Sequence, residues 1–337
     1  MAIYTSGLLY CATLVKVIQK NKKVNKRKKW AIGLAVFALA VTLICLLPLQ
    51  SNVKEKVQFA ANSEAVFRQL QKDSIWYKWW PGEIEPIGRN KVFINGHFRF
   101  VRENILLYTF VFKTTTSSFS TVSKLQLTSE SDNVVTASLQ SSITIPHNPF
   151  NRIKSLFLST KLKESYKEIL SSLSHHFAEN KNQYDVDIKE LTVPFEYVTT
   201  LSDNFSHSPS TAEIYFLIDQ VKAYLKSKEA TEKGSPMLFT TQEAKGKYFV
   251  QVAIPTNKSL PETGKIKSKW MLKGGNILSA QVLGNRQVIS NAKQQLDLYI
   301  HDHHRSVVAI PYEYLITNRI EQPDSNKWVT RIYFPVI

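Results

Sequence analysis

The second half of this 337-residue chain repeats one order of elements, strand, helix, strand, strand, and this doubling leaves few folds open to it. Apolar residues in alternation predict the strands, and apolar residues three to four positions apart predict the helices. The first copy covers 187–205, 210–229, 236–242 and 247–255, and the second covers 274–284, 285–303, 307–317 and 327–337. We expect two such copies to pack about a pseudo-two-fold axis, with a cleft where they meet.

One strand of the second copy, residues 309–317, contains an acidic residue that needs a partner. Successive side chains of a strand point to opposite faces, so Glu313 shares a face with Leu315, and Tyr312 lies on the other. Both faces have the apolar character of buried surface. Because a buried carboxylate is costly unless it is paired or hydrogen-bonded, we expect Glu313 to have a partner. One candidate is an internal ion pair with an Arg or Lys, such as Arg331 in the neighbouring strand.

Residues 52 to about 180 show a different order, with one short helix, a run of strands and one long helix. Asn62 or Ser63 is typical of a helix N-cap, and a short amphipathic helix follows. Strand-like runs separated by turn residues cover 91–100, 104–113, 120–129 and 133–145. Asn148 and Pro149 then suit the start of a long amphipathic helix. This order predicts a curved antiparallel sheet that grips the long helix.

The same part of the chain resembles the START-like or polyketide cyclase (SRPBCC) superfamily. The resemblance rests on the strand and helix that contain Ala61–Phe67, on Trp76, and on the pair Trp80–Pro81. We assign residues 52–180 to it. The resemblance implies a helix-grip fold with an apolar cavity for hydrophobic ligands between the sheet and the long helix, and no fixed catalytic set. The aromatic cluster at 76–80 either lines the entrance of that cavity or packs the helix against the sheet.

Residues 183–337 are similar to the GyrI-like small-molecule-binding family, which includes multidrug-sensing regulators and stand-alone binding proteins. The matching stretches are KGSPMLF (233–239), FVQVAIP (249–255), LKGGNILSAQVLG (272–284), IPYEYLIT (310–317) and WVTRIYFPV (328–336). The entry of the second helix departs from the family pattern. Asn285-Arg286-Gln287 follows Gly284, where the family commonly has a Pro-Tyr-like continuation.

This resemblance implies a role for Glu313. In the family the acid of this strand lies at the centre of the ligand cleft among aromatic rings, where a cationic apolar ligand can pair with it and interact with the ring faces. Trp328 and Trp270 are the aromatic candidates for such a cleft. The internal ion pair with an Arg or Lys such as Arg331 remains the alternative. No helix-turn-helix pattern precedes the domain, so we expect no nucleic-acid partner.

The N-terminal part contains a basic stretch followed by an apolar one. Residues 16–29 contain eight basic residues and no acidic one, and residues 30–49 contain no charged residue. About 20 apolar residues in a helix span a bilayer core, and basic residues before the span favour a cytoplasmic N-terminus. We therefore predict a basic cytoplasmic N-terminus at 1–29, a transmembrane helix at 30–50, and a single-pass protein of the bacterial inner membrane with extracytoplasmic (periplasmic) C-terminal domains. A buried core helix and a cleaved signal peptide are the alternatives.

A net charge of +16 is typical of proteins that bind nucleic acid. Half of this charge lies in residues 16–29, however, and its distribution argues against such a partner. These lysines and arginines are better explained as topology determinants that also contact anionic lipid. The cysteines, Cys11 and Cys45, both lie in the N-terminal part, so the rest of the chain has no disulfide, thiol nucleophile or cysteine metal site. The histidines at 175–176 and 301–304 lie at helix ends without an evident third ligand, so we expect no metal and no cofactor.

Together these observations predict an α+β, membrane-anchored protein that binds small molecules at two sites. One site takes hydrophobic ligands in residues 52–180, and the other takes amphipathic ligands, including cationic ones, in residues 183–337. No catalytic residue is assigned, because no Ser-His-Asp, His-Glu-x-x-His or phosphate-loop pattern is present. Two alternatives remain, a hydrolase or cyclase that uses Glu313 as a general base, and a structural or protein-binding module of the envelope.

Overall fold

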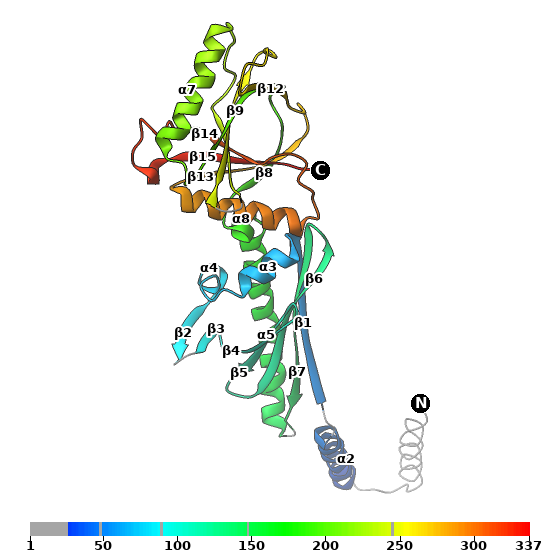
Figure 1. The fold of residues 1–337 in the computed structure, drawn as a ribbon. Coiled ribbons are helices and arrows are strands. Elements are labelled where there is room, and N and C mark those ends of the chain that lie inside the picture. Colours follow the sequence, from blue (N-terminus) through cyan, green and yellow to red (C-terminus); the bar gives the residue numbers. More distant parts are fainter. Residues whose placement is uncertain (1–25, 47–48, 88–89, 147, 244–245) are drawn as a thin grey trace.

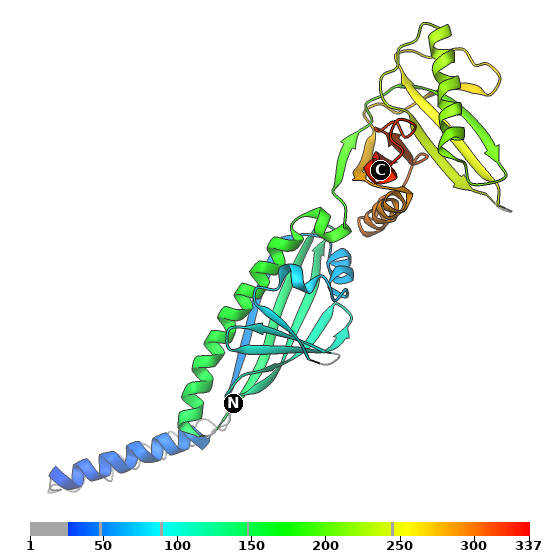
Figure 2. The ribbon, with the colours of Figure 1, turned by 90° about the vertical axis from the view of Figure 1, so that its left-hand side faces the viewer.

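The computed structural model describes an N-terminal helix followed by two units that succeed one another along the molecule (Figures 1 and 2). The described residues are 26–46, 49–87, 90–146, 148–243 and 246–337. Cys11 and most of the predicted N-terminus 1–29 lie outside them. We call the elements from β1 to α5 the sheet-and-helix unit and those from β8 to β15 the doubled unit.

The sheet-and-helix unit contains one seven-stranded antiparallel sheet in the order β1-β7-β6-β5-β4-β3-β2. Its strands are β1 (Leu49–Ala60), β2 (Glu83–Ile87), β3 (Asn90–Asn95), β4 (Phe98–Leu106), β5 (Thr109–Thr115), β6 (Ser120–Ser131) and β7 (Val134–Ile145). Its helices are α3 (Ser63–Leu70), α4 (Trp76–Trp79) and the long α5 (Pro149–Phe177), which lies along β1 and β7 (Figure 2). The predicted sheet around a long helix is therefore observed.

The helix caps predicted in this unit form as expected. The Asn62 side chain accepts hydrogen bonds from the backbone N–H groups of Glu64 and Ala65 at the start of α3. Asn148 does the same for Phe150 and Asn151 at the start of α5. Both caps satisfy N–H groups that have no partner within their helix.

Aromatic side chains fill the space between this sheet and α5. Trp76 is fully buried, and its ring centroid lies 5.0 Å from that of Phe93 and 5.7 Å from that of Phe110. Tyr166 of α5 is also buried and donates a hydrogen bond to Ser123 of β6 over 2.6 Å. Of the two roles considered for the aromatic cluster at 76–80, these contacts match packing of the helices against the sheet.

The doubled unit contains an eight-stranded antiparallel sheet in the order β12-β9-β11-β10-β14-β15-β13-β8. The first copy is β9 (Tyr197–Phe205), α7 (Thr211–Ser227), β10 (Met237–Gln242) and β11 (Tyr248–Thr256), and the second is β13 (Asn276–Leu283), α8 (Arg286–Asp302), β14 (Tyr312–Leu315) and β15 (Val329–Pro335). The copies meet at the β10–β14 pair. From this pair outward, β11 and β9 follow β10 on one side, and their counterparts β15 and β13 follow β14 on the other. The predicted α+β class with two antiparallel sheets is confirmed, whereas the domain boundaries 52–180 and 183–337 stay a prediction.

Two edge strands complete this sheet and correct one expectation. The stretch 187–205, predicted as one strand, forms β8 (Ile188–Thr192) and β9, which lie in opposite halves of the sheet. Pro194 lies between them, and a proline lacks the N–H group that a central strand needs. The other edge strand is β12 (Ile266–Trp270), which pairs with β9.

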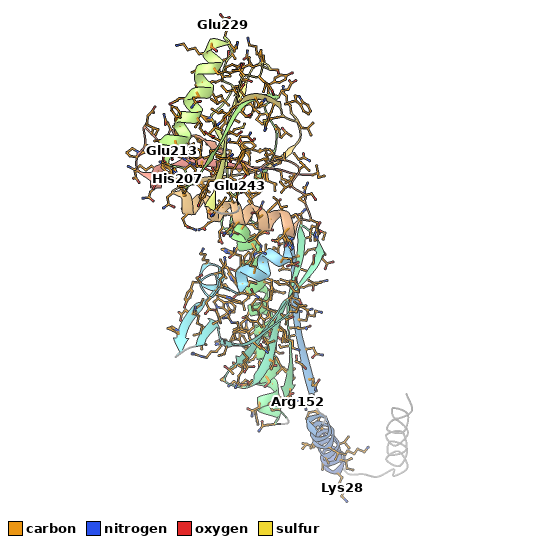
Figure 3. All side chains as sticks on the ribbon, viewed as in Figure 1. Lys28, Arg152, His207, Glu213, Glu229 and Glu243 are labelled. Carbon is orange, nitrogen blue, oxygen red and sulfur yellow. The ribbon has the colours of Figure 1, made fainter. Side chains whose placement is uncertain are left out.

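The helix α7 begins at a capping box of Ser210 and Glu213. The Ser210 hydroxyl accepts from the Glu213 N–H, and the Glu213 carboxylate accepts from the Ser210 N–H. His207 lies beside this box, with Nε2 3.0 Å from Glu213 Oε1 (Figure 3). The cap fixes the direction in which α7 leaves β9.

The prediction of a transmembrane helix at 30–50 is wrong. No helix in the part of the chain that the structure describes is both long and apolar enough to cross a membrane. The helix α2 (Lys26–Leu46) includes four basic residues in its first turn, and β1 starts at Leu49. The residues 30–46 that follow the basic turn extend about 26 Å as a helix, whereas a bilayer core is about 30 Å thick.

Two further predictions depended on that helix. We predicted a single-pass protein of the bacterial inner membrane with extracytoplasmic domains. This prediction is also wrong, because none of the described helices can span a bilayer. The predicted membrane partner is likewise not confirmed.

A buried polar network centred on Asp302, the last residue of α8, joins the two units. The Asp302 side chain is only 2% exposed. Its carboxylate accepts hydrogen bonds from Arg68 of α3 over 2.6 and 3.3 Å and from the Tyr184 hydroxyl over 3.0 Å. The Asn62 side chain, besides capping α3, donates to the Asp302 carbonyl over 2.9 Å. The contact between the units is thus a specific arrangement of charged hydrogen bonds.

Substitution of Arg68 tests this network. Arg68→Met leaves the Asp302 carboxylate buried without its cation, so we expect the free energy of unfolding to fall by about 2–3 kcal/mol. The matched control is Arg99→Met, which breaks an exposed pair with Glu85 and should cost less than about 1 kcal/mol. Denaturant unfolding of the full chain measures both. Equal losses in the two variants would contradict a structural role for the Asp302 network.

Candidate functional site

A single row of paired residues crosses the doubled sheet on the face that α7 and α8 cover, which we call the closed face. The two helices pack on the two ends of this row. The row, read from edge to edge, is Ile266, Leu201, Val252, Leu238, Glu313, Ile332, Ala280 and Ile188. Glu313 is thus the one charged residue in an otherwise apolar row, and it lies in β14 where the two copies meet.

Two cations of the chain neutralise the Glu313 carboxylate. Lys293 of α8 donates to Oε1 over 2.9 Å, and Arg319, in the loop after β14, donates to Oε2 over 2.9 Å. Arg319 also donates to the Thr330 hydroxyl over 3.0 Å, and its guanidinium lies 4.8 Å from the centre of the Trp328 ring. Glu313 and Arg319 are buried, Lys293 is partly exposed, and both carboxylate oxygens are in use.

An internal ion pair, the alternative considered for Glu313, is therefore what the contacts provide, but Arg331 is not a partner. Arg331 is in register with Tyr314 and lies on the other face of the sheet, where it donates to Gln281 over 2.7 Å. The alternation of side chains along β15 could have excluded Arg331. The β15 residue opposite Glu313 is Ile332, so Arg331, one position before it, points to the other face of the sheet.

The surroundings of Glu313 also set its pKa. Burial raises the pKa, but the attraction and hydrogen bonds of Lys293 and Arg319 outweigh burial and hold the pKa below its ordinary value. Glu313 is therefore ionised at neutral pH. The general-base alternative requires a raised pKa, so a carboxylate held ionised by two cations does not favour it.

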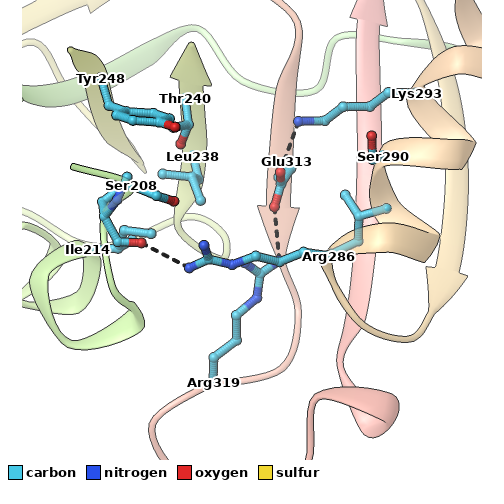
Figure 4. Close-up of a pocket in the computed structure, with 12 residues that line it drawn as sticks. Ser208, Ile214, Leu238, Thr240, Tyr248, Arg286, Ser290, Lys293, Glu313 and Arg319 are labelled. Atoms are coloured by element: carbon cyan, nitrogen blue, oxygen red, sulfur yellow. Dashed lines mark hydrogen bonds and ion pairs between the residues drawn. The ribbon is translucent and has the colours of Figure 1, made fainter. Parts of the chain in front are cut away.

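A pocket of about 180 Å³ lies beside Glu313 on the closed face, between α7 and α8 (Figure 4). Lys293, Arg319 and Arg286 line it together with Glu313. Arg286 reaches across from the first turn of α8 and donates to the Pro209 carbonyl over 3.0 Å. Apolar side chains, Ile214, Leu238 and Ile289, and four hydroxyl-bearing ones, Ser208, Thr240, Tyr248 and Ser290, complete the lining. We call this the closed-face pocket.

The opposite face of the sheet, which we call the open face, has a hollow of different character. This open-face groove has a volume of about 290 Å³. Trp270, Phe239, Met237 and Met271 contribute its aromatic and thioether surface. Trp270 is 63% exposed, so much of its ring is available for contact. Such a surface is typical of sites for flat apolar molecules.

One wall of the open-face groove is Tyr312, the residue before Glu313. Tyr312 is 7% exposed, and its hydroxyl is buried without a hydrogen-bond partner among the described residues. Burial and the neighbouring Tyr333 and Tyr314 raise its pKa, so the hydroxyl remains protonated and able to donate. A buried donor without a partner is unusual in a folded protein and calls for a physical reason.

The structure does not bring the three predicted ligand residues together. Glu313 lies on the closed face, whereas Trp270, the last residue of the edge strand β12, lines the open-face groove. Trp328 is buried beneath Arg319, and its indole N–H donates to the Gln322 carbonyl over 2.8 Å. Sequence reasoning missed Lys293, Arg319 and Arg286. Lys293 and Arg319 lie outside the strands that flank Glu313, so the alternation of side chains along those strands could not have predicted them.

No protein-family model matches the chain, and no curated protein sequence matches it. Among solved structures, the C-terminal domain of EcmrR is 19% identical with a TM-score of 0.38, and the match covers 45% of this chain and 98% of that domain. SAV2435 bound to tetraphenylphosphonium is 12% identical with a TM-score of 0.30, over 44% and 93%. The Zhui aromatase/cyclase from Streptomyces sp. R1128 is 12% identical with a TM-score of 0.30, over 38% and 93%.

These identities and TM-scores are too low to assign a function. EcmrR also matches as a complex with DNA, at 18% identity with a TM-score of 0.39 over 56% of this chain and 71% of that one. The absence of a nucleic-acid partner therefore stays a prediction.

The charges around Glu313 lead to a prediction for stability and its pH dependence. Glu313→Gln leaves Lys293 and Arg319 without a counter-charge, so we expect the free energy of unfolding to fall by about 3 kcal/mol at neutral pH. The folded-state pKa lies below the ordinary 4.5, so the carboxylate stabilises the fold above pH 4.5, and this contribution declines as the pH falls below it. The difference between wild type and variant should therefore shrink in acid.

Urea unfolding at several pH values measures both effects. The matched control is Glu262→Gln, which breaks an exposed pair with Lys267 and should change stability by less than about 1 kcal/mol. If Glu313→Gln were as stable as wild type at neutral pH, the three charges would not hold this part of the sheet together.

Proposed function

We propose that the doubled unit binds a small amphipathic molecule in the open-face groove. The observation that carries the proposal is made on Tyr312, which lines this groove: its buried hydroxyl has no partner among the described residues. A buried donor without a partner costs about 1–3 kcal/mol. A ligand with a hydrogen-bond acceptor removes that cost, so the unpaired hydroxyl favours a bound state.

The lining of the groove indicates the kind of ligand. Trp270, Phe239 and the two methionines favour a flat apolar body, and methionine side chains adapt to rings of different shape. Lys269 and Gln251 add polar groups to the wall. None of the residues that line the groove is acidic, and Glu313 faces away with both oxygens paired. We therefore propose a neutral or anionic ligand, in contrast to the cationic one that the family resemblance implies.

The family relationships remain part of this proposal. We propose that residues 183–337 form a GyrI-like ligand-binding domain, supported by the repeated strand–helix–strand–strand order on both sides of the β10–β14 pair. We propose that residues 52–180 form a START-like domain, supported by the sheet that lies along α5. Packed aromatic rings occupy the interior of the sheet-and-helix unit, so the binding function is assigned to the doubled unit.

The neutral fluorescent ketone Prodan, which has two fused rings and one carbonyl acceptor, is a suitable probe. We expect it to bind the full chain with a blue shift of its emission, because the groove is apolar. Trp270→Ala should weaken binding by about 0.5–1.5 kcal/mol, the range for an aromatic contact. Trp30→Ala, at a 78% exposed position of α2, is the control and should bind as wild type.

Tyr312→Phe gives a sharper test because two effects of opposite sign are expected. Removal of the unpaired hydroxyl should raise the free energy of unfolding of the unliganded protein by about 1 kcal/mol and weaken Prodan by about 1 kcal/mol. Tyr248→Phe, on the closed face, should change neither quantity. Unchanged Prodan affinity in both Tyr312→Phe and Trp270→Ala would contradict the proposal.

A further inference from the structure

We propose that the closed-face pocket is a second binding site, for a small oxyanion. This site is independent of the open-face groove, since the row that contains Leu238 and Glu313 separates the two. The proposal rests on the charges that line the pocket, on the hydrogen-bond donors that remain free there, and on the pocket's size.

The charges that line the pocket do not balance. Arg286, Lys293 and Arg319 contribute three positive charges, and Glu313 contributes the one negative charge of the lining. The Glu313 oxygens are used by Lys293 and Arg319, so the charge of Arg286 is left uncompensated. Among the described residues Arg286 forms no ion pair, and its hydrogen bond goes to the neutral Pro209 carbonyl. An anion in the pocket would balance this excess, whereas a cation would be repelled.

Hydrogen-bond donors also remain available. Lys293 has three donor hydrogens and uses one on Glu313, and the guanidinium of Arg286 has five and uses one on Pro209. The hydroxyls of Ser208, Thr240 and Ser290 line the same pocket and form no hydrogen bond with the described residues. Arginine forks and hydroxyls are the donors that bind carboxylate and phosphate oxygens in proteins.

The dimensions and the apolar lining limit the ligand further. A volume of about 180 Å³ accommodates a few heavy atoms, which suits an oxyanion with a short carbon chain. Ile214, Leu238 and Ile289 would contact that chain. Since the site has an excess of two positive charges, a doubly charged oxyanion fits best. Carboxylate and phosphate share this chemistry, and two probes distinguish them.

The test uses the full chain with sodium phosphate or sodium malonate, each compared with sodium chloride at the same ionic strength. Isothermal titration calorimetry should detect saturable binding of at least one of the two anions. Binding of phosphate alone would identify a phosphate-type ligand, and binding of malonate alone a dicarboxylate. Failure of both anions to bind would overturn the proposal.

Two substitutions locate the binding. Arg286→Gln removes an exposed cation whose hydrogen bond, among the described residues, goes to a backbone carbonyl, so the fold should be retained while anion affinity falls about tenfold or more. Lys154→Gln removes the same charge from an exposed position of α5 and should leave affinity unchanged. If the two variants lost affinity equally, the effect would come from net charge, and a site in the closed-face pocket would be excluded.

Discussion

The arrangement of the doubled unit depends on Glu313, a carboxylate buried in an apolar row of the sheet, and on the two cations that pair with it, Lys293 and Arg319. They connect β14, α8 and the loop after β14 at the point where the two copies meet. A buried charge is tolerated only when it is paired, and here each oxygen of the carboxylate has its own cation. The group therefore fixes the position of α8 over the sheet and leaves Glu313 without an oxygen for an outside cation.

Because a strand alternates its side chains, the same few residues of β10 and β14 serve two faces of opposite character. Tyr312 and Met237 belong to the apolar open-face groove, whereas Glu313 and Leu238, one position along in each strand, belong to the cationic closed-face pocket. The proposed sites for an amphipathic molecule and for a small oxyanion are therefore only one sheet apart. This arrangement follows from the antiparallel register of β10 with β14.

Much of the fold follows from local patterns in the sequence. The caps at Asn62 and Asn148, the long helix α5 and the doubled order of strands and helices were all predicted, because each depends on neighbouring residues. The features that the sequence did not predict depend on contacts between residues far apart in the chain. At the N-terminus the apolar run predicted helix up to residue 50, but Leu49 pairs with Ile145 of β7, so the chain is already a strand there. The partners of Glu313 were missed for a similar reason, since Lys293 comes from a helix twenty residues earlier in the chain.

The central claim, that an amphipathic molecule binds in the open-face groove, can be tested with the methionines. The chain has three, and two of them, Met237 and Met271, line the groove, whereas Met1 is the first residue. In the NMR spectrum of protein labelled with ¹³C at the methionine methyl groups, saturating Prodan should shift the signals of Met237 and Met271 and leave that of Met1 in place. Binding of Prodan without a shift of either groove methionine would contradict the account.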